Sequence, residues 1–157
     1  MVGTMRIALG SDHAGVELKA VLALTLAEWG HETLDLGTHN ATESVDYPDF
    51  GAAVGRSVAS GECDLGVAIC GTGIGISIAA NKVPGVRAAA VHDVTTAHLA
   101  REHNHANVLC LGARLTGPTV AVEALGAWLN ATPAPGRHDV RIAKLDELDK
   151  LLVADER

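Results

Sequence analysis

The sequence predicts a doubly wound α/β domain, in which helices cover both faces of a parallel sheet. Short apolar segments alternate along the chain with longer segments whose apolar residues recur at helical spacing. Most of the short segments are uniformly apolar, which is typical of parallel strands covered on both faces. At 157 residues and 48% hydrophobic, the chain has the length of one domain (1–157) and enough apolar side chains for a sizeable core.

The expected strands cover residues 6–10, 33–36, 65–69, 87–91 and 108–111. The third is the most distinct, because Leu65 to Ile69 is an apolar run that ends at a glycine-rich segment. Five strands with interleaved helices give a five-stranded parallel sheet, and ligands of such sheets bind at the carboxyl ends of the strands.

Helices are expected between these strands and after the last one. The first, over 15–29, has an apolar stripe formed by Leu18, Val21, Leu22, Thr25 and Trp29, with Lys19 outside it. Pro48 suits the start of the second helix and Gly61 its end. Further helices are expected at 76–80, at 94–102 and from 118.

A proline-rich connector, residues 132–136, precedes a last amphipathic helix. Its apolar side is formed by Ile142, Leu145, Leu148 and Leu152. This helix can cover its own sheet or dock on a partner chain, and the sequence does not decide between the two.

Composition argues against several classes of protein. The formal net charge is −7 without a basic run, and only 3% of residues are aromatic, so nucleic-acid binding is not expected. The first residues lack the features of a secretory signal, residues 1–4 form an extension before a second Met, and no apolar stretch approaches the about 18 residues of a membrane span. Three cysteines without a C-x-x-C pair fit free thiols in a reducing cytoplasm.

The segment Cys70-Gly71-Thr72-Gly73-Ile74-Gly75 is the most informative part of the chain. Glycines alternating after a strand predict a tight turn that opens a helix and directs backbone N–H groups at one point, where negative charge is favoured. The helix N-terminus also favours a thiolate at Cys70, so the segment can hold a base or nucleophile beside an oxyanion site. Two other interpretations stay open: a phosphate-binding turn with an inert cysteine, and a nucleotide site with Asp93 as its acidic residue, although the G-x-G-x-G spacing differs from the dinucleotide fingerprint.

Polar residues follow several of the expected strands. Ser11, Asp12 and His13 follow the first, His92 and Asp93 the fourth, and Arg114 the fifth. Taken alone, Asp12 is expected to cap the next helix, and His103 to stabilise a helix C-terminus.

The densest positive cluster is Arg137, His138 and Arg141, which together with Arg114 suits a phosphorylated small molecule, a solvated surface being the alternative. Four histidines, at 92, 98, 103 and 105, raise the alternative of a metal site. No carboxylate or cysteine completes a ligand set in their spacing, so no metal or cofactor is expected.

The chain resembles the type B ribose-5-phosphate isomerases from about Met5 to the last helix. The resemblance rests on SDHAG at 11–15, DYP at 46–48, ICGTGIGISIAANK at 69–82, HN at 103–104, GAR at 112–114 and GRHxxR at 136–141. It implies a Rossmann-like three-layer sandwich that works as a homodimer or homotetramer with active sites shared between chains. It also implies metal-free interconversion of ribose 5-phosphate and ribulose 5-phosphate.

The resemblance also implies roles for single residues. Cys70 matches the base that moves a proton between C2 and C1, with Thr72 beside it, and His103 matches the acid that opens the furanose ring, with Asp12 opposite. Substrate contacts are implied for His13, Tyr47, Gly71, Gly73, Ile74, Gly75, Asn104, Arg114, Arg137, His138 and Arg141. Some relatives use a glutamate shortly after the turn, but Gly75 and Ile76 stand there in this chain, which leaves Cys70 as the candidate base.

Related chains act on other sugar phosphates, so allose 6-phosphate, galactose 6-phosphate and tetrulose phosphates remain alternative substrates. A phosphosugar-binding module without catalysis is the alternative from a different class. The presence of Cys70, Thr72 and His103 together argues for an enzyme.

Overall fold

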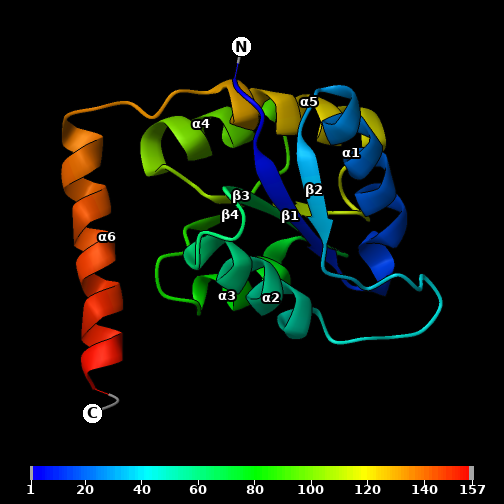
Figure 1. Cartoon of the computed structure of the whole chain (residues 1–157), viewed down its shortest axis with the longest axis horizontal. Coiled ribbons are helices and arrows are strands. Elements are labelled where there is room, and N and C mark those ends of the chain that lie inside the picture. Colours follow the sequence, from blue (N-terminus) through cyan, green and yellow to red (C-terminus); the bar gives the residue numbers. More distant parts are fainter. Residues whose placement is uncertain (1, 156–157) are drawn as a thin grey trace.

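The computed structural model describes residues 2–155 and contains, within them, a five-stranded sheet with the order β2-β1-β3-β5-β4. The strands are β1 (Arg6–Ser11), β2 (Glu32–Asp35), β3 (Leu65–Cys70), β4 (Ala88–Ala90) and β5 (Val108–Gly112). All neighbouring pairs run parallel. The expected doubly wound α/β architecture is therefore confirmed, and it has the three layers of a Rossmann-like sandwich (Figure 1).

All helices of the described residues except the last cover the two faces of the sheet. They are α1 (Val16–Glu28), α2 (Tyr47–Ala59), α3 (Ile74–Asn81), α4 (Val94–Asn104), α5 (Pro118–Asn130) and α6 (Arg137–Ala154), with a 3₁₀ turn, η1 (His13–Gly15), before α1. Helices α1, α4 and α5 lie on one face and α2 and α3 on the other (Figure 1). Each face has its own apolar core, because successive side chains of a strand point to opposite sides of the sheet.

The alternation within β3 decides where its last residue points. Val67 and Ile69 belong to the core under α1, α4 and α5, whereas Ala68 and Cys70 belong to the core under α2 and α3. Cys70 is thus directed toward the side from which α3 begins. On the opposite face, the fully buried Trp128 anchors α5 by donating from Nε1 to the Ala106 carbonyl at 3.1 Å.

The stripe predicted for the first helix is partly wrong. Leu18 and Leu22 are buried as expected, but Trp29 lies beyond the end of α1 and is 43% exposed. Lys19, expected outside the apolar stripe, is 2% exposed. Its ammonium group lies 2.6 Å from Asp35 Oδ1 and 2.6 Å from the Thr38 carbonyl oxygen, so the buried charge has an ion-pair partner and joins α1 to the loop after β2.

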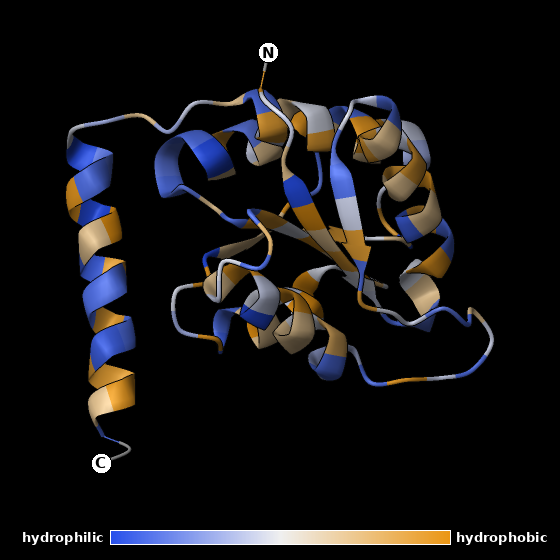
Figure 2. Ribbon diagram, viewed as in Figure 1, coloured by the Kyte–Doolittle hydropathy of each residue, from blue (hydrophilic) through white to orange (hydrophobic). Residues whose placement is uncertain are grey.

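Helix α6 lies apart from the three layers and runs along the edge of the domain beside β4 (Figure 1). Of its side chains, all within the described part of the chain, only His138 and Ile142 are buried. Leu145, Leu148 and Leu152 of the predicted stripe are 45%, 57% and 69% exposed, and Figure 2 shows apolar positions along the whole length of the helix. Beyond the buried Ile142, the stripe is therefore largely exposed in a single chain. No helix within residues 2–155 combines the length and the hydropathy needed to cross a bilayer.

Candidate active site

The glycine-rich turn brings Cys70 against the start of α3. Gly73 has φ +78°, a left-handed conformation that a side chain would strain, and a Cβ there would lie 2.9 Å from the Leu111 carbonyl carbon. In this conformation the Gly73 N–H donates to Cys70 Sγ at 3.2 Å. The Ile74 N–H donates to Thr72 Oγ1, also at 3.2 Å. The N–H of Gly73, at the N-terminus of α3, is therefore directed at the sulfur of Cys70.

The turn continues into N–H groups that can receive an anion. Ser77 makes the first backbone bond of α3 by donating to the Gly73 carbonyl at 3.3 Å. The amides of Gly75 and Ile76 precede it, and amides at this position of a helix have no acceptor within the helix. The positive end of the helix dipole adds to their attraction for negative charge.

Two larger side chains lie directly on this turn. A Cβ added at Gly75 would be 2.6 Å from Tyr47 Cζ, so the phenol ring lies against the backbone there. A Cβ added at Gly71 would be 3.0 Å from Arg114 Nη1. The turn therefore has an aromatic ring on one side and a guanidinium group on the other.

The end of β1 lies beside the end of β3 and adds polar groups to the same edge. Asp12 is 7% exposed, its N–H donates to the Ile69 carbonyl at 3.1 Å, and its Oδ1 accepts from the Ala14 N–H at 3.0 Å. The capping role expected for Asp12 is thus present, and its second carboxylate oxygen remains available. His13 Nδ1 accepts from the Val45 N–H at 3.2 Å, which places the ring proton on Nε2.

A second group of predicted residues gathers where α4 ends and α6 begins. The imidazole rings of His103 and His138 stack, with centroids 4.4 Å apart and planes inclined by 6°. Burial lowers the pKa of His138, and the positive charges of His103, Arg137 and Arg141 lower it further. His103 thus lies in direct contact with His138, a member of the predicted cluster of Arg137, His138 and Arg141.

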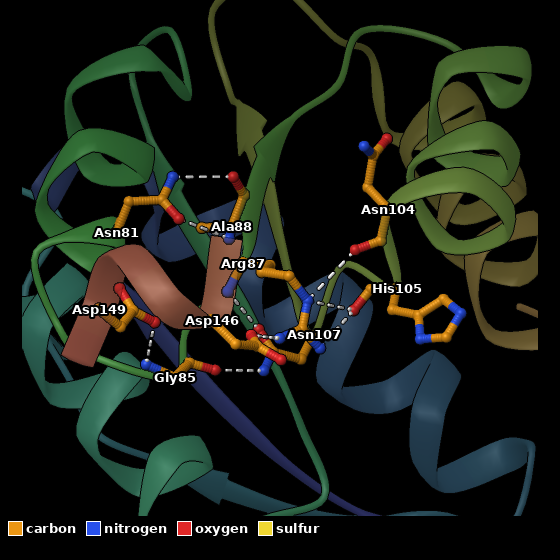
Figure 3. Close-up of polar contacts among 9 residues, drawn as sticks. All are labelled: Asn81, Gly85, Arg87, Ala88, Asn104, His105, Asn107, Asp146 and Asp149. Carbon is orange, nitrogen blue, oxygen red and sulfur yellow. Dashed lines mark hydrogen bonds and ion pairs between the residues drawn. The ribbon is translucent and has the colours of Figure 1, made fainter. Parts of the chain in front are cut away.

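Arg87 connects this end of α4 to α6 (Figure 3). Its Nε donates to the Asn104 carbonyl at 3.2 Å, and its Nη2 to the His105 carbonyl at 3.2 Å. Its Nη1 lies 3.2 Å from Asp146 Oδ1 on α6. Farther along α6, Asp149 accepts from the Gly85 N–H at 2.8 Å. Arg87 was not singled out by the sequence, because its partners are backbone carbonyls and one distant carboxylate.

The two groups of residues lie at opposite ends of the sheet. Cys70 pairs with Gly112, the last residue of β5. Arg87, which holds the Asn104 and His105 carbonyls, accepts from the N–H of Val108, the first residue of β5. A strand of this length separates its ends by about 13 Å, since each residue adds about 3.3 Å.

Each predicted site residue lies at one of these two ends of the sheet. At the carboxyl ends of the strands lie Asp12, His13, Tyr47, Cys70, Gly71, Thr72, Gly73, Ile74, Gly75 and Arg114. At the other end lie His103, Asn104, Arg137, His138 and Arg141. A single chain does not bring the two groups together.

Three further candidates, Asp93, His98 and His105, have structural partners. Asp93 Oδ1 caps α4 by accepting from the Thr96 N–H at 2.7 Å, which accounts for the residue without a nucleotide. Within residues 2–155, no three His, Cys, Asp or Glu side chains gather in a way that could hold a metal ion. His98 instead lies 2.9 Å from Glu102, and His105 lies 3.9 Å from Asp139.

The chain has close relatives among known proteins. A family model described as Ribose/Galactose Isomerase matches residues 7–145. Ribose-5-phosphate isomerase B of Escherichia coli (strain K12) is 43% identical over 145 residues, covering 92% of this chain and 97% of that protein. The structure of Clostridium thermocellum ribose-5-phosphate isomerase B matches with a TM-score of 0.92 and 51% identity, covering 94% of this chain and 99% of that one.

A further structure, ribose-5-phosphate isomerase B from Mycoplasma genitalium with bound ribulose 5-phosphate, matches with a TM-score of 0.89 and 40% identity, covering 92% of this chain and 96% of that one. Because these matches extend over nearly the whole chain, the protein belongs to the ribose/galactose isomerase family.

Proposed function

We propose that this protein is an aldose–ketose isomerase that interconverts ribose 5-phosphate and ribulose 5-phosphate through an enediolate. The observation that carries the proposal is the contact of the Gly73 N–H with Cys70 Sγ at the N-terminus of α3. This contact supports the proposal because Cys70, the candidate base, shares one turn with a set of backbone donors. The relatives named as ribose-5-phosphate isomerases support this substrate.

In the proposed mechanism, His103 first gives a proton to the ring oxygen of the furanose, and the Asp12 carboxylate opposite accepts the proton of the anomeric hydroxyl. The bond between C1 and the ring oxygen breaks, and an open-chain aldehyde forms. The Cys70 thiolate then removes the proton on C2, and the electron pair moves onto the carbonyl oxygen. N–H groups of the turn 71–75 other than those of Gly73 and Ile74, which donate to Cys70 and Thr72, stabilise that oxyanion. Such a contribution typically amounts to about 10²–10³ in rate for one donor. Cys70 returns its proton to C1, and a proton moves from O2 to O1, so atoms and charges balance.

We assign the substrate phosphate to Arg137 and Arg141, with Arg114 and His13 on the other side. Guanidinium groups bind phosphate oxygens in pairs, and both arginines on α6 are exposed, so neither has to be released from the core before it binds. The ring of Tyr47, which packs against the backbone of Gly75, offers one face to the sugar.

We further propose a homodimer or homotetramer in which each active site combines the turn of one chain with the α4–α6 end of another. The opposite placement of Cys70 and His103 in one chain supports this assembly, since general acid and base must both reach one sugar. The exposed leucines of α6 support it too, because an uncovered apolar stripe gains stability when a partner covers it.

A coupled isomerase assay tests the function. We expect turnover of ribose 5-phosphate with a kcat/KM above that for allose 6-phosphate, galactose 6-phosphate or a tetrulose phosphate. A higher kcat/KM for one of those sugars would change the substrate and keep the reaction class. Binding of all of them without turnover would favour the phosphosugar-binding module.

We also infer that the protein acts in the cytoplasm. Cys63, Cys70 and Cys110, all in the described part of the chain, are free and buried thiols. A base that must stay a free thiolate needs a reducing compartment.

A further inference from the structure

The stack of His103 and His138 is a contact that the proposed mechanism does not use. His138 lies in the first turn of α6 and is 9% exposed, whereas His103 ends α4 and is only partly buried. Their rings are nearly parallel at 4.4 Å, closer than most aromatic pairs. The stack uses one face of the His138 ring and leaves the nitrogens at its edge free, so the ring can do more than bind phosphate.

The charges around the pair limit how many protons it can hold. Arg137 and Arg141 reach it from α6, and Glu102 reaches it from α4, where its carboxylate also holds His98 at 2.9 Å. Asp139 of α6 lies on the far side, 3.9 Å from His105. Two stacked imidazolium rings between two arginines would repel strongly, and one carboxylate shared with His98 does not offset this.

We propose that His138 is a positioning residue for His103: it stays neutral, offers its ring face as a platform, and holds the single proton of the pair on His103. The inference rests on the proposed role of His103 in ring opening. The more exposed ring is the better place for the charge, because water solvates it, and a neutral aromatic face beside an imidazolium is attractive. Burial and the neighbouring positive charges, which lower the pKa of His138, act in the same direction.

The platform links phosphate binding to ring opening. His138 stands between Arg137 and Arg141 in one helical turn, so the element that binds the phosphate also fixes the plane of the His103 ring. Locking that plane restricts the direction in which His103 delivers its proton, and orientation of this kind acts on kcat rather than on binding.

Histidine titration by NMR tests the shared proton without any turnover. In the wild-type protein we expect His138 to take up its proton below the ordinary histidine midpoint of about 6.5. The substitution His103→Gln removes the opposing charge, so the midpoint of His138 is expected to rise, while His92→Gln at the other end of α4 leaves it unchanged. An unchanged His138 midpoint in His103→Gln would overturn the proposal.

Kinetics test the platform. His138→Ala is expected to lower kcat with ribose 5-phosphate about 3- to 10-fold, the range given by one aromatic pair, at a similar KM. His138→Phe keeps a flat ring and is expected to stay within about 2-fold of the wild type. Equal losses in both variants, or a raised KM at constant kcat, would mean that His138 serves the phosphate instead. A wild-type protein without isomerase activity would refute the proposed function, and the titration would still decide about the stack.

Discussion

Mixing inactive variants tests the division of the site between two ends of the sheet. Cys70→Ala removes the proposed base, and His103→Asn removes the proposed acid, so each variant alone is expected to be nearly inactive. If subunits exchange freely in a dimer, about half of the dimers are hybrids. In a hybrid, one site carries both defects and the other carries neither.

The expected recovery follows from this arithmetic. About half of the dimers are hybrids, and each hybrid has one intact site out of two. The mixture is therefore expected to reach about a quarter of the wild-type specific activity. The measurement is a coupled isomerase assay on the mixed sample, with exchange verified by native mass spectrometry of chains that carry different tags. At substrate concentrations well below KM, where a raised KM lowers the rate, Arg137→Ala is expected to complement Cys70→Ala as His103→Asn does, because both side chains belong to the α4–α6 end.

The matched control combines two variants from the same end. Cys70→Ala mixed with Asp12→Asn gives hybrids in which each site has one defect, so no recovery is expected. Recovery in this control, or none in the first mixture despite confirmed exchange, would show that the assignment of residues to the two ends is wrong.

Further substitutions probe the base, the phosphate, a buried ion pair and the dependence of stability on pH. Cys70→Ala is expected to lower kcat at least about 10³-fold with little change in substrate affinity, because a base acts mainly in the transition state; kcat and the dissociation constant are measured separately. Arg137→Ala is expected to raise KM for ribose 5-phosphate about 10- to 100-fold, since one charge-assisted hydrogen bond contributes about 1.5–3 kcal/mol. Lys19→Ala is expected to lower the free energy of unfolding by about 1.5–3 kcal/mol, measured by urea denaturation, because Asp35 loses its partner. His138 has a lowered pKa in the folded state, so the unfolded chain binds its proton first and stability declines as the pH falls below about 6.5. Denaturation at pH 7.5 and 5.5 is expected to show a smaller decline for His138→Phe, and an equal decline would contradict the assignment.

Local patterns predicted the elements well, because each depends on neighbours in sequence. The run Leu65 to Ile69 and the glycine-rich turn after it could be predicted for this reason, and β3 extends one residue further, to Cys70. Gly73 takes the left-handed conformation that such a turn requires. Lys19 was misplaced because its partner Asp35 lies on β2, and no helical periodicity contains that information. Arg87 was missed because it binds main-chain carbonyls, which every residue has and which leave no pattern in the sequence.

The position of His103 was harder to predict than its presence. It follows a helix, and a helix that connects parallel strands runs back toward their starting edge, so its C-terminus lies away from Cys70. The order of strands and helices already contained this signal. The stack with His138 could not be predicted, because it depends on how far the connector 131–136 carries α6 from α5.

The separation of α6 from the sandwich also has a consequence for the order of folding events. The β-sheet and the helices α1 to α5 can close their cores within one chain, whereas the leucines at 145, 148 and 152 find no core there. Refolding is therefore expected to show a first phase, the same at every protein concentration, in which Trp128 becomes buried. Burial of the α6 leucines then requires a second chain. Isomerase activity is therefore expected to return in a second-order phase whose rate increases with protein concentration. At high dilution, where single chains predominate, the sheet and the helices α1 to α5 would be folded but the protein would have no isomerase activity.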